Sequence, residues 1–310
     1  MAYEQLPTPL TIAITGANSG IGLRAARQLA LAGHEVVALC RDPDRGATAL
    51  EQINRGVARP ARMVPVDLAD LGSVRTAAAT VRREFDHLDA LINNAALFDQ
   101  TLRQPVRSRD GHELFWATNH LGPFLLTALL SPLLAAAPAP RLLTIASKGL
   151  IAHPHLRIRF PELDWPEVAD WYTPTRAYYH AKLAQVMTSF SLAERAGGQL
   201  RVTCLRVPAV RLDPDRTAAL PRLLRVLHAP KNRIALPPER LARSYAQLVT
   251  GHAPGAVRPS RDAGADPLRG LYVNEDLEPV RAPVHAHDTS DRRRLWTRTQ
   301  AATGNPDWAW

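Results

Sequence analysis

Cysteine, long apolar runs and lysine are scarce in this 310-residue chain, and each shortage excludes a class of protein. The two cysteines, Cys40 and Cys204, stand in segments typical of strand interiors, so neither a disulfide framework nor a cysteine-based metal site is expected. No apolar run reaches the roughly 18 residues that a membrane-spanning helix needs, and the opening MAYEQLPTPL lacks the pattern of a secretory leader. We therefore expect a soluble protein of the reducing cytoplasm.

Lysine occurs only at Lys148, Lys182 and Lys231, so 35 of the 38 basic residues are arginine. The formal net charge of +9 would suit an acidic partner. The arginines are scattered, however, apart from the run Arg292, Arg293 and Arg294. We interpret the charge as a solvated basic surface and expect neither a nucleic-acid nor a membrane partner.

Short apolar segments alternate with segments of helical periodicity along the chain. The expected strands are 10–15, 34–40, 61–68, 88–94, 140–147 and 200–207, and the expected helices include 20–32, 73–85 and 111–134. Apolar strands separated by helices are typical of a parallel sheet covered on both faces. The sequence therefore predicts an α/β fold, a single doubly wound Rossmann domain over 1–285. Irregular segments at 148–176 and 208–235 are expected to wall a substrate site, and 286–310 to form a helix with a loose NPDWAW end.

The segment TGANSGIG (15–22) follows the first expected strand and opens a helix. Gly16, Gly20 and Gly22 permit a tight turn and close backbone approach, and the free N–H groups of a helix N-terminus attract a pyrophosphate. This placement predicts a dinucleotide site.

The end of the second strand indicates which dinucleotide is bound. NAD enzymes place an acid about 20 residues after the glycine turn, but here the strand ends at Cys40, followed by Arg41. A cation without an acid suits the 2′-phosphate of NADP. Asp42 leaves an alternative open, because it could pair with Arg41 or take the ribose hydroxyl itself.

The segment AYYHAKLA (177–184) places Tyr178 and Lys182 four residues apart, on one face of an expected helix. A cation beside a phenol favours the phenolate, so Lys182 is expected to tune Tyr178 toward acid/base work at neutral pH. Tyr179 lies four residues before Leu183 and receives no such help. A tyrosine and a lysine at this spacing also occur by chance, so this pattern alone does not decide.

These segments, with VDLADLGSV, LINNAA, DGHELFWATNHLGPFLLT, RLLTIAS and RRLWTRTQAATG, resemble the short-chain dehydrogenase/reductase family from about Leu10 to Gly304. The likeness is to its TGxxxGxG branch and, in the longer phrases, to retinol-dehydrogenase-like members. It implies a catalytic tetrad of Asn119, Ser147, Tyr178 and Lys182. Tyr178 would be the general acid or base, Ser147 would hold the substrate oxygen, Lys182 would bond the nicotinamide ribose, and Asn119 would organise a water relay.

The resemblance also implies a set of NADP-binding residues and no metal ion. The expected cofactor residues are Gly16, Ser19, Gly20, Ile21, Gly22, Arg41, Asp67, Leu68, Asn94, Ala95, Tyr178, Lys182 and Pro208. The insertion between Ser147 and Tyr178 contains Trp165, Trp171 and Tyr172, which could line a lipophilic substrate or pack against the sheet. His153, His155 and His180 lack acidic partners at metal-ligand spacing.

The chain departs from the family pattern at two places. The family's NNAG is Asn93-Asn94-Ala95-Ala96 here, and the segment PAVRLDPD puts Ala209 in place of a glycine and Asp213 near the place of a threonine that contacts the nicotinamide. The resemblance therefore implies an NADP-dependent oxidoreductase that interconverts a hydroxyl and a carbonyl on a lipophilic or polycyclic small molecule, as a possible homodimer or homotetramer. The altered loop leaves two alternatives: a biosynthetic enzyme without net redox, such as a cyclase, epimerase or dehydratase, and a cofactor-sensing protein.

Overall fold

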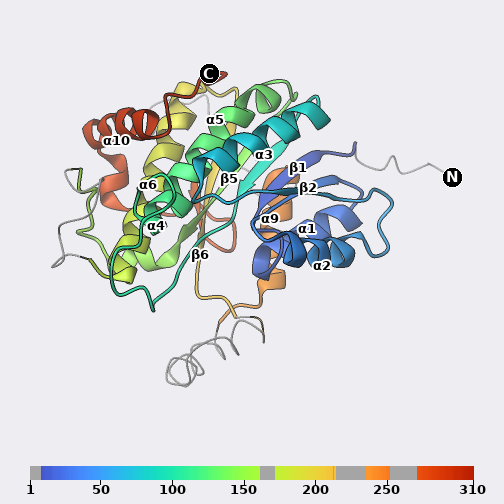
Figure 1. The fold of residues 1–310 in the computed structure, drawn as a ribbon, viewed down its shortest axis with the longest axis horizontal. Helices are drawn as coiled ribbons and strands as arrows, with labels where there is room; N and C mark the ends of the chain where they lie inside the picture. Colours follow the sequence, from blue (N-terminus) through green and yellow to red (C-terminus); the bar gives the residue numbers. More distant parts are fainter. Residues whose placement is uncertain (1–7, 161–171, 212, 214–234, 252–270) are drawn as a thin grey trace.

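The structure is a computed structural model that describes residues 8–160, 172–211, 213, 235–251 and 271–310 (Figure 1). Two residues of the expected substrate wall, Trp165 and Trp171, lie outside these ranges, as does most of 208–235.

The described strands form one parallel sheet of seven, in the order β3-β2-β1-β4-β5-β6-β7. The strands are β1 (Thr11–Thr15), β2 (Glu35–Cys40), β3 (Arg62–Pro65), β4 (Ala90–Asn93), β5 (Arg141–Ser147), β6 (Arg201–Val207) and β7 (Tyr272–Val273). The order reverses between β1 and β4, which is where open α/β sheets bind ligands at the carboxyl ends of their strands. The predicted doubly wound α/β fold is confirmed.

Helices cover both faces of the sheet (Figure 1). The helices are α1 (Gly20–Leu31), α2 (Pro43–Asn54), α3 (Leu71–Glu84), α4 (Leu114–Trp116), α5 (Gly122–Ala135), α6 (Pro174–Arg195), α9 (Pro238–Thr250) and α10 (Thr289–Ala302). One apolar core joins the sheet to α3, α5 and α6, and a second joins its other face to α1 and α9. Over the described ranges, no helix is both long and apolar enough to cross a bilayer.

The expected helix 111–134 is interrupted. A π-helical turn, Ala117–Leu121, lies between α4 and α5. At the start of α5, a Cβ on Gly122 would lie 2.1 Å from the Leu68 carbonyl oxygen, so glycine lets this helix approach the backbone beyond β3. The interruption fixes where Thr118 and Asn119 lie relative to the sheet ends.

The last residues of the chain pack against the domain, so the expectation of a loose NPDWAW end is wrong. The Trp308 ring lies 5.0 Å from Phe124 of α5 and 4.9 Å from Trp296 of α10, measured between centroids. The Ala309 amide donates to Ser131 Oγ at 2.9 Å. These aromatic contacts tie the C-terminus to α5.

Candidate active site

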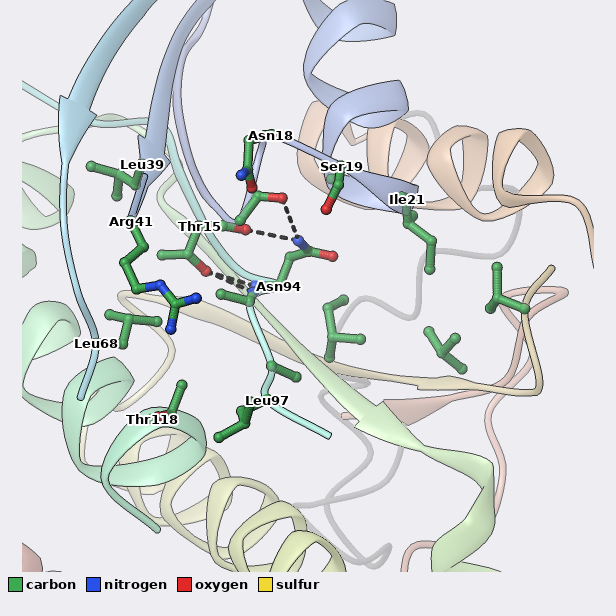
Figure 2. A pocket seen from close by; sticks show the side chains of 18 of the residues that line it. Thr15, Asn18, Ser19, Ile21, Leu39, Arg41, Leu68, Asn94, Leu97 and Thr118 are labelled. Carbon is green, nitrogen blue, oxygen red and sulfur yellow. Dashed lines mark hydrogen bonds between the residues drawn. The ribbon is translucent and has the colours of Figure 1, made fainter. Parts of the chain in front are cut away.

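A cavity of about 470 Å³ opens at the carboxyl ends of the central strands (Figure 2). All thirteen residues expected to bind the cofactor line it, and so does Ser147. The sequence did not single out several further lining residues: Thr15, Asn18, Arg45, Thr118, Val210 and Tyr245. Segments distant in sequence therefore converge on one elongated site.

The glycine turn is fixed by hydrogen bonds from the two residues that follow β4. Gly16 and Gly20 have φ values of +68° and +57°, and a Cβ on Gly22 would lie 2.3 Å from the Gly16 carbonyl oxygen. The Asn94 side-chain amide donates to the Thr15 carbonyl at 2.7 Å, and the Asn94 and Ala95 backbone amides donate to Thr15 Oγ1 at 3.0 and 2.9 Å (Figure 2). These contacts hold the turn open toward the cavity.

The change from NNAG to NNAA causes no backbone strain. Within the described residues, positive φ values outside glycine occur only at Leu277 and Asn305, so Ala96 has an ordinary conformation. The Tyr245 hydroxyl of α9 donates to Asn94 Oδ1 at 3.1 Å. This support spans 151 residues, and no local pattern in the sequence indicates it.

Two arginines lie at the end of the cavity next to β2. Arg41 projects into the cavity from the end of this strand (Figure 2), and Arg45 lines it from the first turn of α2. Asp42 Oδ1 accepts from the Asp44 and Arg45 amides, both at 3.0 Å, and so caps α2. Cys40 is buried, and burial raises the pKa of its thiol to about 11. This end of the site is cationic, and its strand carries no acid at the tip.

Ser147 and Tyr178 meet at the opposite end of the cavity. Ser147 ends β5, and its side chain hydrogen-bonds with both Tyr178 and Tyr179 of α6. Burial raises the pKa of Tyr178, the neighbouring Tyr179 adds to the rise, and the hydrogen bond to Ser147 opposes it. Tyr178 is therefore protonated at neutral pH, and the expected lowering of its pKa by Lys182 is not found in the free protein.

Tyr179 faces a different part of the structure. Its hydroxyl lies where a Cβ on Gly149 would clash, 2.0 Å away, and its ring lies 4.6 Å from His153. The Tyr178 ring instead packs against Phe98, with 4.6 Å between the ring centroids. Of the two adjacent tyrosines, only Tyr178 lines the cavity among the described residues.

Lys182 lies one turn beyond Tyr178 and is almost fully buried. Its Nζ donates to the Ile145 carbonyl at 2.8 Å and to Gln185 Oε1 at 2.9 Å, and it lies 5.9 Å from the Tyr178 ring centroid. Burial lowers the pKa of Lys182 to about 7, and Cys204 nearby has a weaker, opposing effect. Gln185 was not expected as a partner of this lysine.

Asn119 lies behind the cavity and does not line it. The residue is fully buried in the π turn, where its amide nitrogen donates to the Leu97 carbonyl at 2.9 Å. Its Oδ1 accepts from the Leu97 amide at 2.7 Å. The neighbouring Thr118 reaches the cavity instead (Figure 2), so the water relay implied for Asn119 stays a prediction.

Asp213 contacts the glycine turn itself. Its Oδ2 accepts from the Gly20 amide at 3.0 Å, and its Oδ1 accepts from Arg24 Nη2 at 2.7 Å. The Asp213 carboxylate thus covers the first amide of α1, which is a group that binds anions at helix N-termini.

Tyr172 is a packing residue rather than part of an open wall. It is buried against Phe115, and its hydroxyl donates to Glu113 Oε1 at 3.5 Å. His180 is also buried, and its Nε2 accepts from the Arg159 amide at 3.0 Å. Over the ranges that the structure describes, no three His, Cys, Asp or Glu side chains converge as a metal site.

A parallel sheet with a glycine turn after its first strand, and with a serine, a tyrosine and a lysine at the far end of one cavity, defines a dinucleotide-binding Rossmann protein. The donors present fit such a ligand: arginines at one end, turn amides in the middle and hydroxyls at the other end. Comparison with known proteins gives the family: the chain belongs to the short-chain dehydrogenase/reductases.

Several matches support this assignment. The family model "short chain dehydrogenase" matches residues 10–155. Human dehydrogenase/reductase SDR family member 13 is 34% identical over 300 residues, covering 95% of this chain and 73% of the relative. Human retinol dehydrogenase 13 is 36% identical over 309 residues, covering 95% and 84%. The resemblance to retinol-dehydrogenase-like members is confirmed.

Solved structures show the same fold. A crystal structure of a Mycobacterium paratuberculosis protein superposes with a TM-score of 0.66 at 27% identity, covering 100% of both chains. A Shigella flexneri short chain dehydrogenase, solved in complex with NADP, has a TM-score of 0.60 at 21% identity, covering 80% of this chain and 93% of that chain.

Proposed function

We propose that this protein is an NADP-dependent oxidoreductase that interconverts a hydroxyl and a carbonyl on a lipophilic small molecule. One observation carries the proposal: Ser147, Tyr178 and Lys182 stand at one end of a cavity whose other end presents Arg41 and Arg45. A 2′-phosphate is a dianion that guanidinium groups bind well. Asp42 also lines this end of the cavity, but its Oδ1 is engaged by the amides that begin α2.

The chain's own residues account for the proton and the charge. A nicotinamide cofactor supplies or accepts the hydride when bound. During reduction, negative charge develops on the carbonyl oxygen, Tyr178 donates its phenolic proton there, and Ser147 donates a hydrogen bond to the same oxygen. The raised pKa of Tyr178 keeps that proton available at neutral pH. In alcohol oxidation the same hydroxyls act in reverse.

An exposed apolar side chain against the proton donor supports a lipophilic substrate. Phe98, which is 45% exposed, packs on Tyr178. Exposed apolar side chains beside a reactive centre suit an apolar ligand. Two of the relatives are named dehydrogenases of retinol, itself a lipophilic alcohol, in human and mouse.

The test compares the two adjacent tyrosines. We expect Tyr178→Phe to lower turnover at least ~100-fold while NADPH binding is retained, because only the proton donor is lost. Tyr179→Phe removes the same atom from the neighbouring residue. It breaks one hydrogen bond to Ser147 but leaves the proton donor in place, so turnover should fall by less than about tenfold. Wild-type turnover in Tyr178→Phe would contradict the assignment.

Asp213 on the glycine turn favours a second candidate, an enzyme of the same fold without net redox. The two are separated by counting NADPH consumed per product formed. One NADPH per carbonyl reduced supports the oxidoreductase, and product without NADPH consumption supports a cyclase, epimerase or dehydratase.

A further inference from the structure

We propose that Asp213 is a built-in competitor for the diphosphate of the cofactor, so that the cofactor binds only as this carboxylate leaves the Gly20 amide. The proposal rests on the proposed function, because it takes the ligand of the cavity to be a dinucleotide.

The contacts of Asp213 are those that a diphosphate would make. The Gly20 amide, at the first residue of α1, donates to one carboxylate oxygen at 3.0 Å. Arg24, one turn further along α1, donates to both oxygens, at 2.7 and 3.3 Å. A helix N-terminal amide and a forked guanidinium are the groups that bind phosphates in proteins.

Two anions cannot share these donors. Asp213 and Gly20 both line the cavity, so the carboxylate lies inside the site rather than beside it. A diphosphate brought to the same amide would meet a like charge at hydrogen-bond distance, which disfavours binding. The carboxylate must therefore withdraw before the diphosphate can occupy the turn.

The chain just before Asp213 is anchored by a small bridge. The Arg211 amide donates to the Leu236 carbonyl at 3.0 Å, and the Leu236 amide donates to the Ala209 carbonyl at 3.1 Å. This small bridge anchors the chain beyond β6, two residues before Asp213. The contact of Asp213 with Gly20 is not one of the hydrogen bonds of this bridge, so its loss leaves the bridge intact.

Arg24 keeps a second partner when Asp213 withdraws. Its Nε donates to Glu239 Oε1 of α9 at 2.6 Å. The Glu239 side chain is 56% exposed. Glu239 is not among the residues that line the cavity, so it offers a matched control. Glu239→Gln removes a carboxylate from the same arginine but leaves the Gly20 amide covered.

The experiment is a calorimetric titration of the full chain with NADPH, in the wild type and in Asp213→Asn, Asp213→Thr and Glu239→Gln. If the carboxylate covers the amide in about nine molecules of ten, the apparent Kd of the wild type is raised about tenfold. We therefore expect both Asp213 variants to bind NADPH at least about tenfold more tightly. The affinity of Glu239→Gln for NADPH should rise less than about threefold.

Thermal unfolding gives a second readout that needs no turnover. Without NADPH, the Asp213 variants should unfold at a lower temperature than the wild type, because α1 loses its anionic contact. With saturating NADPH, their gain in unfolding temperature should exceed that of the wild type.

The outcomes separate this proposal from the proposed function. If both Asp213 variants bind NADPH no more tightly than the wild type, Asp213 is not a competitor of the diphosphate. The same conclusion follows if Glu239→Gln gains as much affinity as the Asp213 variants. Neither result contradicts the proposed oxidoreductase activity. Tighter binding without turnover on any ketone or alcohol supports the competitor and counts against the oxidoreductase. Failure of every protein to bind NADPH or NADH overturns both.

Discussion

Burial sets the protonation of single residues around the cavity. Lys182 and Glu113 are each about 1% exposed, and burial lowers the pKa of the first and raises that of the second, each to about 7. The charged forms of both groups are therefore disfavoured, and both titrate near neutral pH.

Gln185 is expected to control the charge of Lys182. Its Oε1 accepts from the ammonium at 2.9 Å. The other groups that face this ammonium are Cys204, the Tyr178 ring and the Ile145 carbonyl. A hydrogen bond to a charged group is worth about 1.5–3 kcal/mol, so Gln185→Leu should lower the pKa of Lys182 by about one, and Gln185→Glu should raise it.

The low lysine content makes the pKa of Lys182 measurable by NMR. With only three lysines, carbon-13 labelling of the lysine Cε gives three NMR signals, which Lys148→Arg and Lys231→Arg assign by loss. Midpoints that are the same in the wild type and in both Gln185 variants would show that Gln185 does not position the ammonium.

Glu113 should make stability depend on pH. Its pKa in the fold, about 7, lies above its usual value of 4.5, so the folded protein holds this proton more tightly than the unfolded chain. The resulting stabilisation is fully present below the usual pKa and is lost as the pH rises through 7. Its upper limit is about 3 kcal/mol, from 1.36 kcal/mol for each pKa unit.

The matched variant is Glu113→Gln, because an amide oxygen can still accept from the Trp116 amide as Oε2 does at 2.8 Å. Urea unfolding of both proteins at pH 5 and pH 8 should show the wild type losing stability relative to the variant as the pH rises. If the difference in unfolding free energy between the two proteins is the same at both pH values, Glu113 does not titrate in this range.

At the scale of elements, the turn between β2 and α2 is the part of the site that distinguishes the two dinucleotides. Arg41, which follows β2, and Arg45, in the first turn of α2, both line the cavity. Asp42 lies between them and caps α2. We therefore expect Arg41→Ala and Arg45→Ala each to weaken NADPH about tenfold or more, since each removes a charge-assisted phosphate contact.

NADH is the control ligand, because it lacks the 2′-phosphate. Its Kd should change less than about threefold in both variants, measured by the same titration. If the affinities for NADPH and NADH fall equally, the arginines stabilise the turn and do not bind the 2′-phosphate.

The sequence predicts the elements that short-range patterns define, but not the contacts between residues far apart in the chain. The strands and the turn 15–22 are visible because apolar runs and glycine spacing reflect short-range geometry. Helical periodicity over 111–134 could not reveal the π turn at Ala117–Leu121, which changes the winding by a single residue. The contact of Asp213 with Gly20 spans 193 residues, so the sequence indicated an altered loop but not where its carboxylate lies.

At the scale of the whole molecule, the C-terminal helix packs Leu295 and Trp296 into the core and exposes Arg293, Arg294 and Arg298. Arg292 is 3% exposed and its Nη2 donates to Glu194 of α6 at 2.8 Å, while Arg294 lies 4.2 Å over the Phe160 ring. Arg292 is therefore not part of the solvated basic surface that the net charge suggested. The Arg292–Glu194 contact ties α10 to α6, the helix that carries Tyr178 and Lys182.

The final segment should therefore contribute to the stability of the entire domain. Trp308 is half-buried between Phe124 and Trp296, and its indole nitrogen donates to Gln300 Oε1 at 3.0 Å. We expect Trp308→Ala to lower the free energy of unfolding by about 2–3 kcal/mol, since it removes a large aromatic side chain from the cluster.

Val284→Ala is the control, because this apolar side chain is 69% exposed and its truncation should cost less than about 0.5 kcal/mol. Urea unfolding followed by far-ultraviolet circular dichroism measures both variants. If Trp308 ties α10 to the core, the loss appears in a single transition of the whole domain. An early separate transition, with the main one unshifted, would instead make the C-terminal segment an independent unit whose packing against α5 does not stabilise the site.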